Sequence, residues 1–132
     1  MREGTVSVLS LETDALITRI IGCAITVHRA LGSGFLESIY STALAFELES
    51  AGIPFERERA ITVNYRGLAI GGQRVDFIVA NTVILEIKAA TRVDPVFQAK
   101  LISYLRTTGL KAGLLINFNV PLVKEGIKGI VA

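Results

Sequence analysis

The sequence predicts an α/β fold in which helices pack on a mixed β-sheet. Two helical patterns come first, three strand patterns joined by short turns follow, and a third helical pattern separates them from a further apolar strand. Strands joined by tight turns run antiparallel, whereas a strand, a helix and a second strand form a crossover between parallel strands. All 132 residues are expected to form a single domain, because the chain is too short for two ordinary cores.

The first two helices follow from the spacing of apolar residues. Residues 1–10 carry no clear pattern and are expected to form a short strand or a loose arm. A helix is predicted from about Leu11 to Leu31, and "GSG" at 32–34 ends it. A second helix is predicted from about Phe35 to Ser50, where Ala51-Gly52 is a common C-terminal stop.

The middle of the chain changes from helical to alternating patterns. "ITVNY" at 61–65 alternates as a half-buried strand does, "RG" at 66–67 is typical of a hairpin turn, and "GG" at 71–72 favours a bulge. A second hairpin follows in "RVDFIVANTVILEIKA", residues 74–89. These three strands are therefore expected to be antiparallel.

The remaining elements have clear boundary residues. Asp94 is a favourable N-cap and Pro95 suits the first position of a helix, which is predicted to end near Thr108-Gly109. "AGLLINF" at 112–118 is typical of a buried strand, and "GIKGIVA" at the C-terminus permits a short final one.

Burial selects the register of the second hairpin. If Asn81-Thr82 alone formed the loop, polar and apolar side chains would mix on both faces. A three-residue loop at 80–82 instead gathers the large apolar side chains on one face, and Asn81 suits the left-handed conformation that such loops need. The facing pairs on that apolar face are Val79 with Val83, Phe77 with Leu85, and Val75 with Ile87.

The other face of this hairpin holds two carboxylates. In the same register Asp76 faces Glu86, and Arg74 faces Lys88. Carboxylates whose β-carbons lie about 5 Å apart destabilise a sheet unless something neutralises them, and a divalent cation such as Mg²⁺ takes oxygen ligands of this kind. Lys88 is then a candidate to position water or to stabilise charge on a phosphate. The alternative is an exposed ladder of ion pairs in which Arg74 and Lys88 neutralise the two acids.

Two polar residues lie on apolar stripes of predicted helices. Glu37 shares a face with Tyr40 and Leu44, and Gln98 shares a face with Leu101. Both are therefore candidates to point toward the carboxylates. The alternatives are a first-turn glutamate that meets the helix dipole and a hydrogen-bonded core amide.

Composition excludes several kinds of site. A single histidine and a single cysteine cannot supply a zinc site or a Ser-His or Cys-His triad. His28 is expected to cap its helix or to face solvent, and Cys23 to be a buried, inert thiol. The formal net charge of +2, with no cluster of Lys or Arg, does not by itself indicate a nucleic-acid partner.

The apolar content and the location can also be predicted. Hydrophobic residues make up 51% of the chain, so part of the apolar surface is expected in the interface of a homodimer or a larger homo-oligomer. The longest apolar run, 16–31, is interrupted by charges and is too short to span a bilayer, and no secretion signal precedes it. With one cysteine, these features favour a cytoplasmic protein.

Several motifs, in this order, resemble those of a known family. They are G-x-x-E-x-x-Y at 34–40, the strand with Asp76, "LEIKA" at 85–89, the helix with Gln98, and "TGLKAGLLINF" at 108–118. The chain thus resembles the GxxExxY proteins, which are assigned to the PD-(D/E)XK nuclease-like superfamily. The resemblance extends over nearly the whole chain.

This resemblance implies a fold, an activity and a metal site. The fold is a three-layer αβα core like that of restriction endonucleases, with two N-terminal helices. The activity is metal-dependent hydrolysis of phosphodiester bonds in nucleic acid, with DNA as the expected partner. Asp76, Glu86 and the backbone carbonyl of Ile87 would bind Mg²⁺ or Mn²⁺.

Further residue roles follow from the same resemblance. Lys88 would assist the water nucleophile, Glu37 would complete or support the metal shell, and Gln98 matches a glutamine of the exonuclease-like branch. The chain departs from the family pattern in that Val75 replaces a proline and the tyrosine expected four residues after Gln98 is Tyr104 instead. The alternative function is a catalytically inactive nuclease-fold module that binds nucleic acid, regulates or assembles.

Overall fold

The computed structural model describes residues 9–132, so most of the expected N-terminal strand or arm lies outside the described residues. The helices are α1 (Leu11–Leu31), α2 (Glu37–Ser50), α3 (Pro95–Thr108) and the short 3₁₀ helix η1 (Val123–Gly126). The strands are β2 (Phe55–Tyr65), β3 (Leu68–Val79), β4 (Val83–Lys88), β5 (Ala112–Asn117) and β6 (Ile127–Val131). Within the described part of the chain, no helix combines the length and apolar character needed to cross a membrane.

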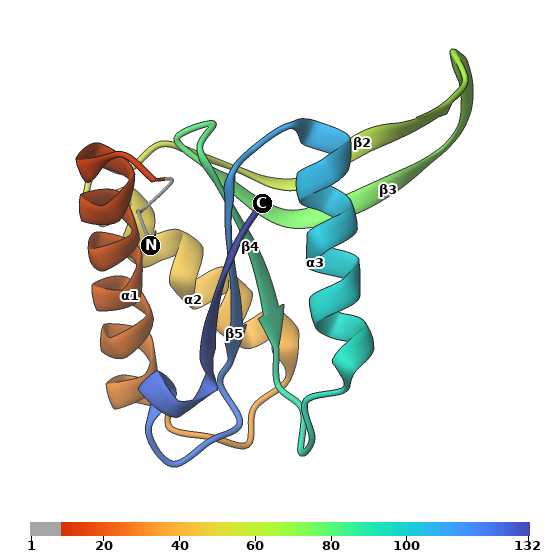
Figure 1. The fold of residues 1–132 in the computed structure, drawn as a ribbon. Coiled ribbons are helices and arrows are strands. Elements are labelled where there is room, and N and C mark those ends of the chain that lie inside the picture. Colours follow the sequence, from red (N-terminus) through yellow and green to blue (C-terminus); the bar gives the residue numbers. More distant parts are fainter. Residues whose placement is uncertain (1–8) are drawn as a thin grey trace, which may run out of the picture.

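The strands form one mixed sheet in the order β2-β3-β4-β5-β6. β2, β3 and β4 are antiparallel neighbours, β4 and β5 are parallel, and β6 runs antiparallel to β5 at the far edge. α3 connects the two parallel strands as the predicted crossover helix (Figure 1). The predicted α/β class with a mixed sheet is therefore confirmed.

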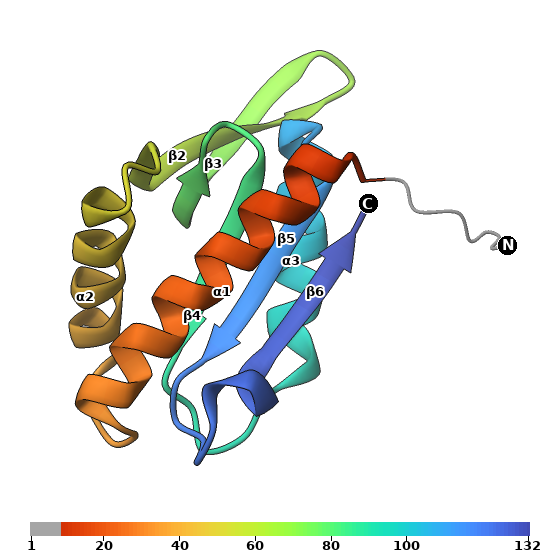
Figure 2. The same cartoon turned by 90° about the vertical axis from the view of Figure 1, so that its left-hand side faces the viewer.

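Helices cover both faces of the sheet. α1 and α2 lie on one face and α3 lies on the other, as the two views in Figures 1 and 2 show. The core accordingly divides into two clusters of buried side chains. One contains residues of α1 and α2 together with Phe77, Leu85 and Ile87, and the other contains residues of α3 together with Ile78 and Ile84. This is the expected three-layer αβα arrangement.

Local capping sets the ends of two helices. The hydroxyl of Ser10 accepts a hydrogen bond from the backbone N–H of Thr13 at the start of α1 (3.0 Å). At the start of α3 the Asp94 carboxylate accepts one from the N–H of Val96 (2.9 Å). Gly109 ends α3 in the left-handed conformation, with φ 78°. α1 and α3 therefore have the predicted bounds.

α2 begins two residues later than predicted, at Glu37, because the preceding loop is held by Tyr40. The fully buried Tyr40 hydroxyl donates to the carbonyl of Gly32 (2.6 Å) and accepts from the N–H of Phe35 (3.1 Å). Gly34 lies between them with φ 105°, a conformation that L side chains rarely adopt. This loop fixes where Glu37 enters the helix.

The structure corrects the prediction for His28 and confirms that for Cys23. The carbonyl of His28 accepts the N–H of Gly32 at the end of α1 (2.8 Å), but the imidazole is buried rather than exposed. Its Nε2 is hydrogen-bonded to the carbonyl of Val120 (2.9 Å), so the β5–η1 connection covers it. Cys23 is buried, and burial raises the pKa of its thiol.

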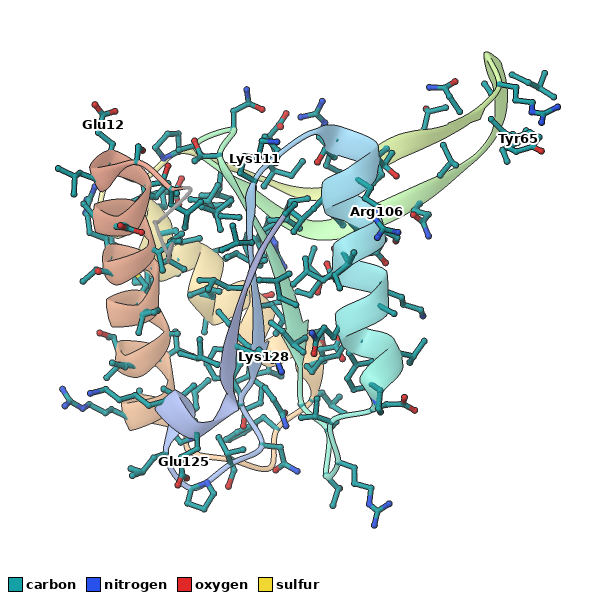
Figure 3. The ribbon with its side chains drawn as sticks, in the orientation of Figure 1. Glu12, Tyr65, Arg106, Lys111, Glu125 and Lys128 are labelled. Atoms are coloured by element: carbon teal, nitrogen blue, oxygen red, sulfur yellow. The ribbon has the colours of Figure 1, made fainter. Side chains whose placement is uncertain are left out.

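β2 and β3 form a long hairpin that extends beyond the sheet, with Tyr65 at its tip (Figures 1 and 3). Arg66 and Gly67 make the predicted turn, both with positive φ (52° and 84°). The register shifts after the Val63–Gly71 pair, so Ile70 is an extra residue, and a bulge is present one residue before the expected Gly71-Gly72. The distal half of this hairpin, residues 60–73, is here called the arm.

Replacing Tyr40 by phenylalanine tests the loop that precedes α2. The variant keeps the ring but removes both hydrogen bonds, which should lower the free energy of unfolding by about 1–3 kcal/mol because two backbone groups lose their partner. Urea denaturation measures the change. Tyr65→Phe is the matched control, because Tyr65 is 58% exposed and its loss of a hydroxyl should change stability by less than about 0.5 kcal/mol. Equal effects of the two variants would contradict the role given to Tyr40.

Candidate active site

The β3–β4 hairpin has the predicted register near its loop. The facing pairs are Val79 with Val83, Ile78 with Ile84, and Phe77 with Leu85. The loop is residues 80–82, in which Ala80 and Asn81 both have a left-handed φ of 51°. The choice of a three-residue loop is therefore confirmed.

Beyond Phe77 the ladder stops, and two crossed hydrogen bonds take its place. The backbone N–H of Asp76 donates to Oε2 of Glu86 (2.9 Å). The backbone N–H of Ile87 donates to Oδ2 of Asp76 (2.8 Å). Each carboxylate thus bridges to the opposite strand, and the predicted backbone pairing of Asp76 with Glu86 is not part of the ladder.

The alternation of faces is also broken at this point. Phe77 and Ile87 belong to the cluster under α1 and α2, whereas Val75 belongs to the cluster next to α3. The predicted pair of Val75 with Ile87 on one apolar face is therefore wrong. β2, the other neighbour of β3, is irregular at the same level. Its residue Glu58, between the two residues that pair with Phe77 and Val75, has a left-handed φ of 50°. Such an irregularity bends a strand and redirects its side chains.

The alternative of a ladder of ion pairs is not formed. Arg74 lies within 3.4 Å of Glu58 rather than opposite Lys88, and its side chain is exposed. Among residues 9–132, neither Asp76 nor Glu86 forms a salt bridge with Lys or Arg. The two carboxylates therefore share an environment without a contacting cationic side chain.

Burial governs the protonation of the pair. Glu86 is 6% exposed, and its burial, followed by the nearby charge of Asp76, raises the pKa of Glu86 to about 7. Burial also raises the pKa of Asp76, although the hydrogen bond from Ile87 opposes the rise. In the described part of the chain, one oxygen of each carboxylate accepts no hydrogen bond. Those two oxygens remain available to a ligand.

A groove of about 530 Å³ opens beside Asp76. It is lined by Leu36, Glu37, Ser38, Ser41, Arg57, Glu58, Arg74, Asp76 and Ile87. The groove thus brings Glu37 of α2 to the same opening as Asp76 and Ile87. Partial burial raises the pKa of Glu37, while Lys88 lowers it and Asp76 raises it. Within residues 9–132, no three Asp, Glu, His or Cys side chains converge closely enough to hold a metal ion by themselves.

Lys88 and Gln98 lie at the α3 side of these residues. The Lys88 Nζ is 4.6 Å from the centroid of the Phe97 ring, a cation–π distance, and Lys88 is half-buried. Burial raises the pKa of Asp76 and of Glu86, whereas the positive charge of Lys88 lowers the pKa of each. Gln98 is half-buried on α3, and its amide makes no hydrogen bond within the described residues. The structure therefore does not join Gln98 directly to the carboxylates.

Asn117 is a site residue that the sequence did not single out. It is 2% exposed, and its Oδ1 accepts from the N–H of Ala90 (3.0 Å) while its Nδ2 donates to the carbonyl of Ala90 (3.0 Å). The N–H of Phe118 also donates to the carbonyl of Lys88 (2.9 Å). These bonds fix the segment that follows Lys88. One polar residue at the end of an otherwise apolar strand was the available signal.

Tyr104 was noted only as a departure from the family pattern, yet it lies near the acids. Its side chain is 7% exposed. Burial raises its pKa, and the charges of Glu86 and Asp76 raise it further. Its hydroxyl forms no hydrogen bond within residues 9–132 and is available as a donor.

Stability should depend on pH through Glu86. Its folded pKa of about 7 exceeds the ordinary value of 4.5, so between these values the folded protein holds a proton that the unfolded chain releases. Without divalent metal, the free energy of unfolding should therefore fall as pH rises from 5 to 8, by up to about 3 kcal/mol from this group. Glu86→Gln keeps an oxygen that accepts the Asp76 N–H, and should be more stable than wild type at pH 8.

Urea denaturation in EDTA at pH 5 and pH 8 measures this difference. Glu49→Gln is the matched control, because Glu49 is exposed on α2 and its substitution should leave the pH dependence intact. A Glu86→Gln variant that is less stable than wild type at pH 8 would contradict the account.

Asn117→Ala should lower the free energy of unfolding by about 1–3 kcal/mol, because it leaves both backbone groups of Ala90 without their partner. Thermal or urea unfolding measures the loss. Asn119→Ala is the control, since only the backbone N–H of Asn119 takes part in this group of hydrogen bonds. The role of Asn117 would be refuted by two variants of equal stability.

Comparison with known proteins identifies the family of the chain. A family model described as the PD-(D/E)XK nuclease superfamily matches residues 14–130. A search of curated proteins and a search of solved structures each found no significant match. The matched range contains Glu37, Asp76, Glu86 and Lys88, and it covers nearly all of the chain from α1 to β6. The chain therefore belongs to the PD-(D/E)XK nuclease superfamily.

Proposed function

We propose that the protein is a divalent-metal-dependent nuclease that hydrolyses phosphodiester bonds in nucleic acid, with DNA as its substrate. The observation that carries the proposal is the pair Asp76 and Glu86, crossed between two strands, with one oxygen of each left free of hydrogen bonds. Membership of the superfamily supports the class of reaction.

The residues present fit a Mg²⁺ or Mn²⁺ ion. Both ions take oxygen ligands, and Mg²⁺ is commonly held by one or two carboxylates with substrate phosphate and water as the remainder. Asp76 and Glu86 would supply the carboxylates, and the backbone carbonyl of Ile87 a further oxygen. Such an ion supplies charge neutralisation at phosphorus and lowers the pKa of water. Glu86 is buried and Asp76 half-buried, and neither contacts a Lys or Arg within residues 9–132, which supports this assignment.

The protein's own side chains would orient the substrate and the attacking water. The Lys88 ammonium lies over the Phe97 ring, and the Asn117 side chain fixes the backbone at Ala90. The ammonium thus has a defined position from which to orient water or to stabilise charge on the phosphate. Glu37 would support the metal shell from across the groove, as an acceptor for water. Gln98 has an amide free to donate to a substrate oxygen.

Two arginines of the groove would position the phosphate backbone. Arg57 is held by the Ser41 hydroxyl (3.3 Å) and lies 5.6 Å from the centroid of the Phe77 ring. Arg74 lines the same groove on the neighbouring strand. Guanidinium groups match phosphate geometry, so these residues compensate locally for the low net charge of the chain.

Membership of the GxxExxY branch is part of the proposal. Each residue of the motif has a structural role that is consistent with this membership. Gly34 adopts a positive φ, Glu37 lines the groove, and Tyr40 holds the loop that precedes α2. The spacing of the motif thus matches the requirements of one loop and one groove.

A catalytically inactive nuclease-fold module is the second candidate. The observation that favours it is that Glu37, Asp76 and Glu86 do not converge as a ready set of three metal ligands. The net charge of +2 is also low for a protein whose function is to hold nucleic acid by phosphate contacts alone.

A cleavage assay on plasmid, linear and branched DNA with Mg²⁺ or Mn²⁺ tests the proposal. Wild type should cleave, and Asp76→Asn, which keeps an acceptor for the Ile87 N–H, should lose at least about 100-fold in rate. Lys88→Met should lose a similar factor. Lys100→Met is the control for the lysine, because Lys100 is exposed on α3 and its loss should leave the rate unchanged.

Titration calorimetry with the metal alone separates the two candidates. Metal uptake by wild type, weakened in Asp76→Asn, supports the nuclease. A folded wild-type protein that takes up no metal and cleaves none of the substrates would overturn it in favour of the inactive module.

A further inference from the structure

The arm carries an apolar face that the rest of residues 9–132 leaves uncovered. Ile61 of β2 is 8% exposed and packs next to α3, and Val63 and Tyr65 continue the same face at the strand period of two. Tyr65 faces Leu68 across the hairpin, yet these side chains are 58% and 63% exposed. Figure 3 shows Tyr65 at the tip, beyond the end of α3. An alternating pattern of this kind normally marks a face that packs against something.

A second uncovered apolar surface lies between α1 and α2. It is a groove of about 490 Å³ whose lining includes Val27, Leu31, Ile39, Ala43, Phe46 and Glu47. Phe46 is 65% exposed and Ile39 is 44% exposed, although both lie at this groove. The arm points away from α1 and α2 in Figure 1, so the tip does not reach the groove of its own chain.

The charges on the two surfaces are few and opposite. From residue 60 to residue 73 the only charged side chain is Arg66, and among the described residues only Glu47 brings a charge to the lining of the groove. The Cζ atom of Arg66 lies 5.6 Å from the centroid of the Tyr65 ring. Neither Arg66 nor Glu47 forms a salt bridge within residues 9–132. An arm that follows a phosphate backbone would carry several Lys or Arg, so this one fits a protein surface better than a nucleic acid.

We propose that the occupant of the α1–α2 groove is the arm of a second copy of this chain. Tyr65 and Leu68 of one copy contact Phe46 and its neighbours in the other, and Arg66 meets Glu47. Because the arm and the groove lie on opposite sides of one chain, the contact runs head to tail and joins successive copies of the chain. The base of the same hairpin carries Arg57 and Arg74, which line the candidate active-site groove, so docking of the arm also fixes one wall of that groove.

Sedimentation velocity over a range of concentrations tests the self-association. Wild type should associate into larger species as its concentration rises, and Leu68→Asp and Phe46→Asp should each weaken this self-association at least tenfold while circular dichroism shows an intact fold. Leu122→Asp is the matched control, because Leu122 is 66% exposed but lies on neither surface. A wild type that stays monomeric at all concentrations, or a self-association that Leu68→Asp and Phe46→Asp leave unchanged, would overturn the proposal.

Charge exchange tests the pairing of Arg66 with Glu47. Arg66→Glu alone and Glu47→Arg alone should each weaken the self-association, and the doubly exchanged chain should recover it, because opposite charges again meet at each contact. Failure of the double variant to recover more than either single variant would contradict the pairing.

Disulfide trapping distinguishes this arrangement from others. A mixture of Leu68→Cys and Phe46→Cys chains should cross-link to each other under mild oxidation, since the native Cys23 is buried. Leu68→Cys alone should stay uncross-linked. Cross-linking of Leu68→Cys to itself would show arm-to-arm pairing instead and would overturn the proposal.

Discussion

The crossed hydrogen bonds between β3 and β4 are the constraint on which the candidate site depends. Where the ladder stops, two backbone N–H groups need new acceptors, because buried N–H groups without partners are rare. Asp76 and Glu86 supply them, so the same two acids join β3 to β4 and form the candidate site. These bonds favour the ionised carboxylates, whereas burial favours the neutral ones and prevails, raising the pKa of Glu86 to about 7. In the proposed function, a divalent cation would take the place of this proton.

One buried series of contacts braces both sides of this site. Tyr40 holds the loop before Glu37, and its ring stacks on Phe118 with centroids 4.6 Å apart. Phe118 follows Asn117, whose side chain holds the backbone of Ala90 just after Lys88. The glutamate on α2 and the lysine on β4 are therefore positioned through the same few residues, although they come from different layers of the fold.

Local signals made most of the fold predictable, and long-range contacts decided the rest. Asp94 and Pro95 act within their own helix, so the start of α3 was predictable from nearby residues. The alternation of side chains on either side of the 80–82 loop likewise made the register of the hairpin predictable there. The end of the ladder at Asp76 could not, because it depends on side-chain bonds to Ile87 that no periodic pattern encodes. His28 was misplaced for the same reason, since Val120 covers it from 92 residues away. The residues of the candidate site were predictable by type, and their roles as metal ligands stay predictions.

The proposed function requires that a metal ion binds between the two crossed carboxylates. The most direct measurement is a crystal structure of the protein grown with saturating Mn²⁺, with anomalous diffraction recorded to locate the metal. The expected result is one peak within about 2–2.5 Å of the free oxygens of Asp76 and Glu86. A well-ordered site with both crossed hydrogen bonds intact and no peak between the carboxylates would contradict it.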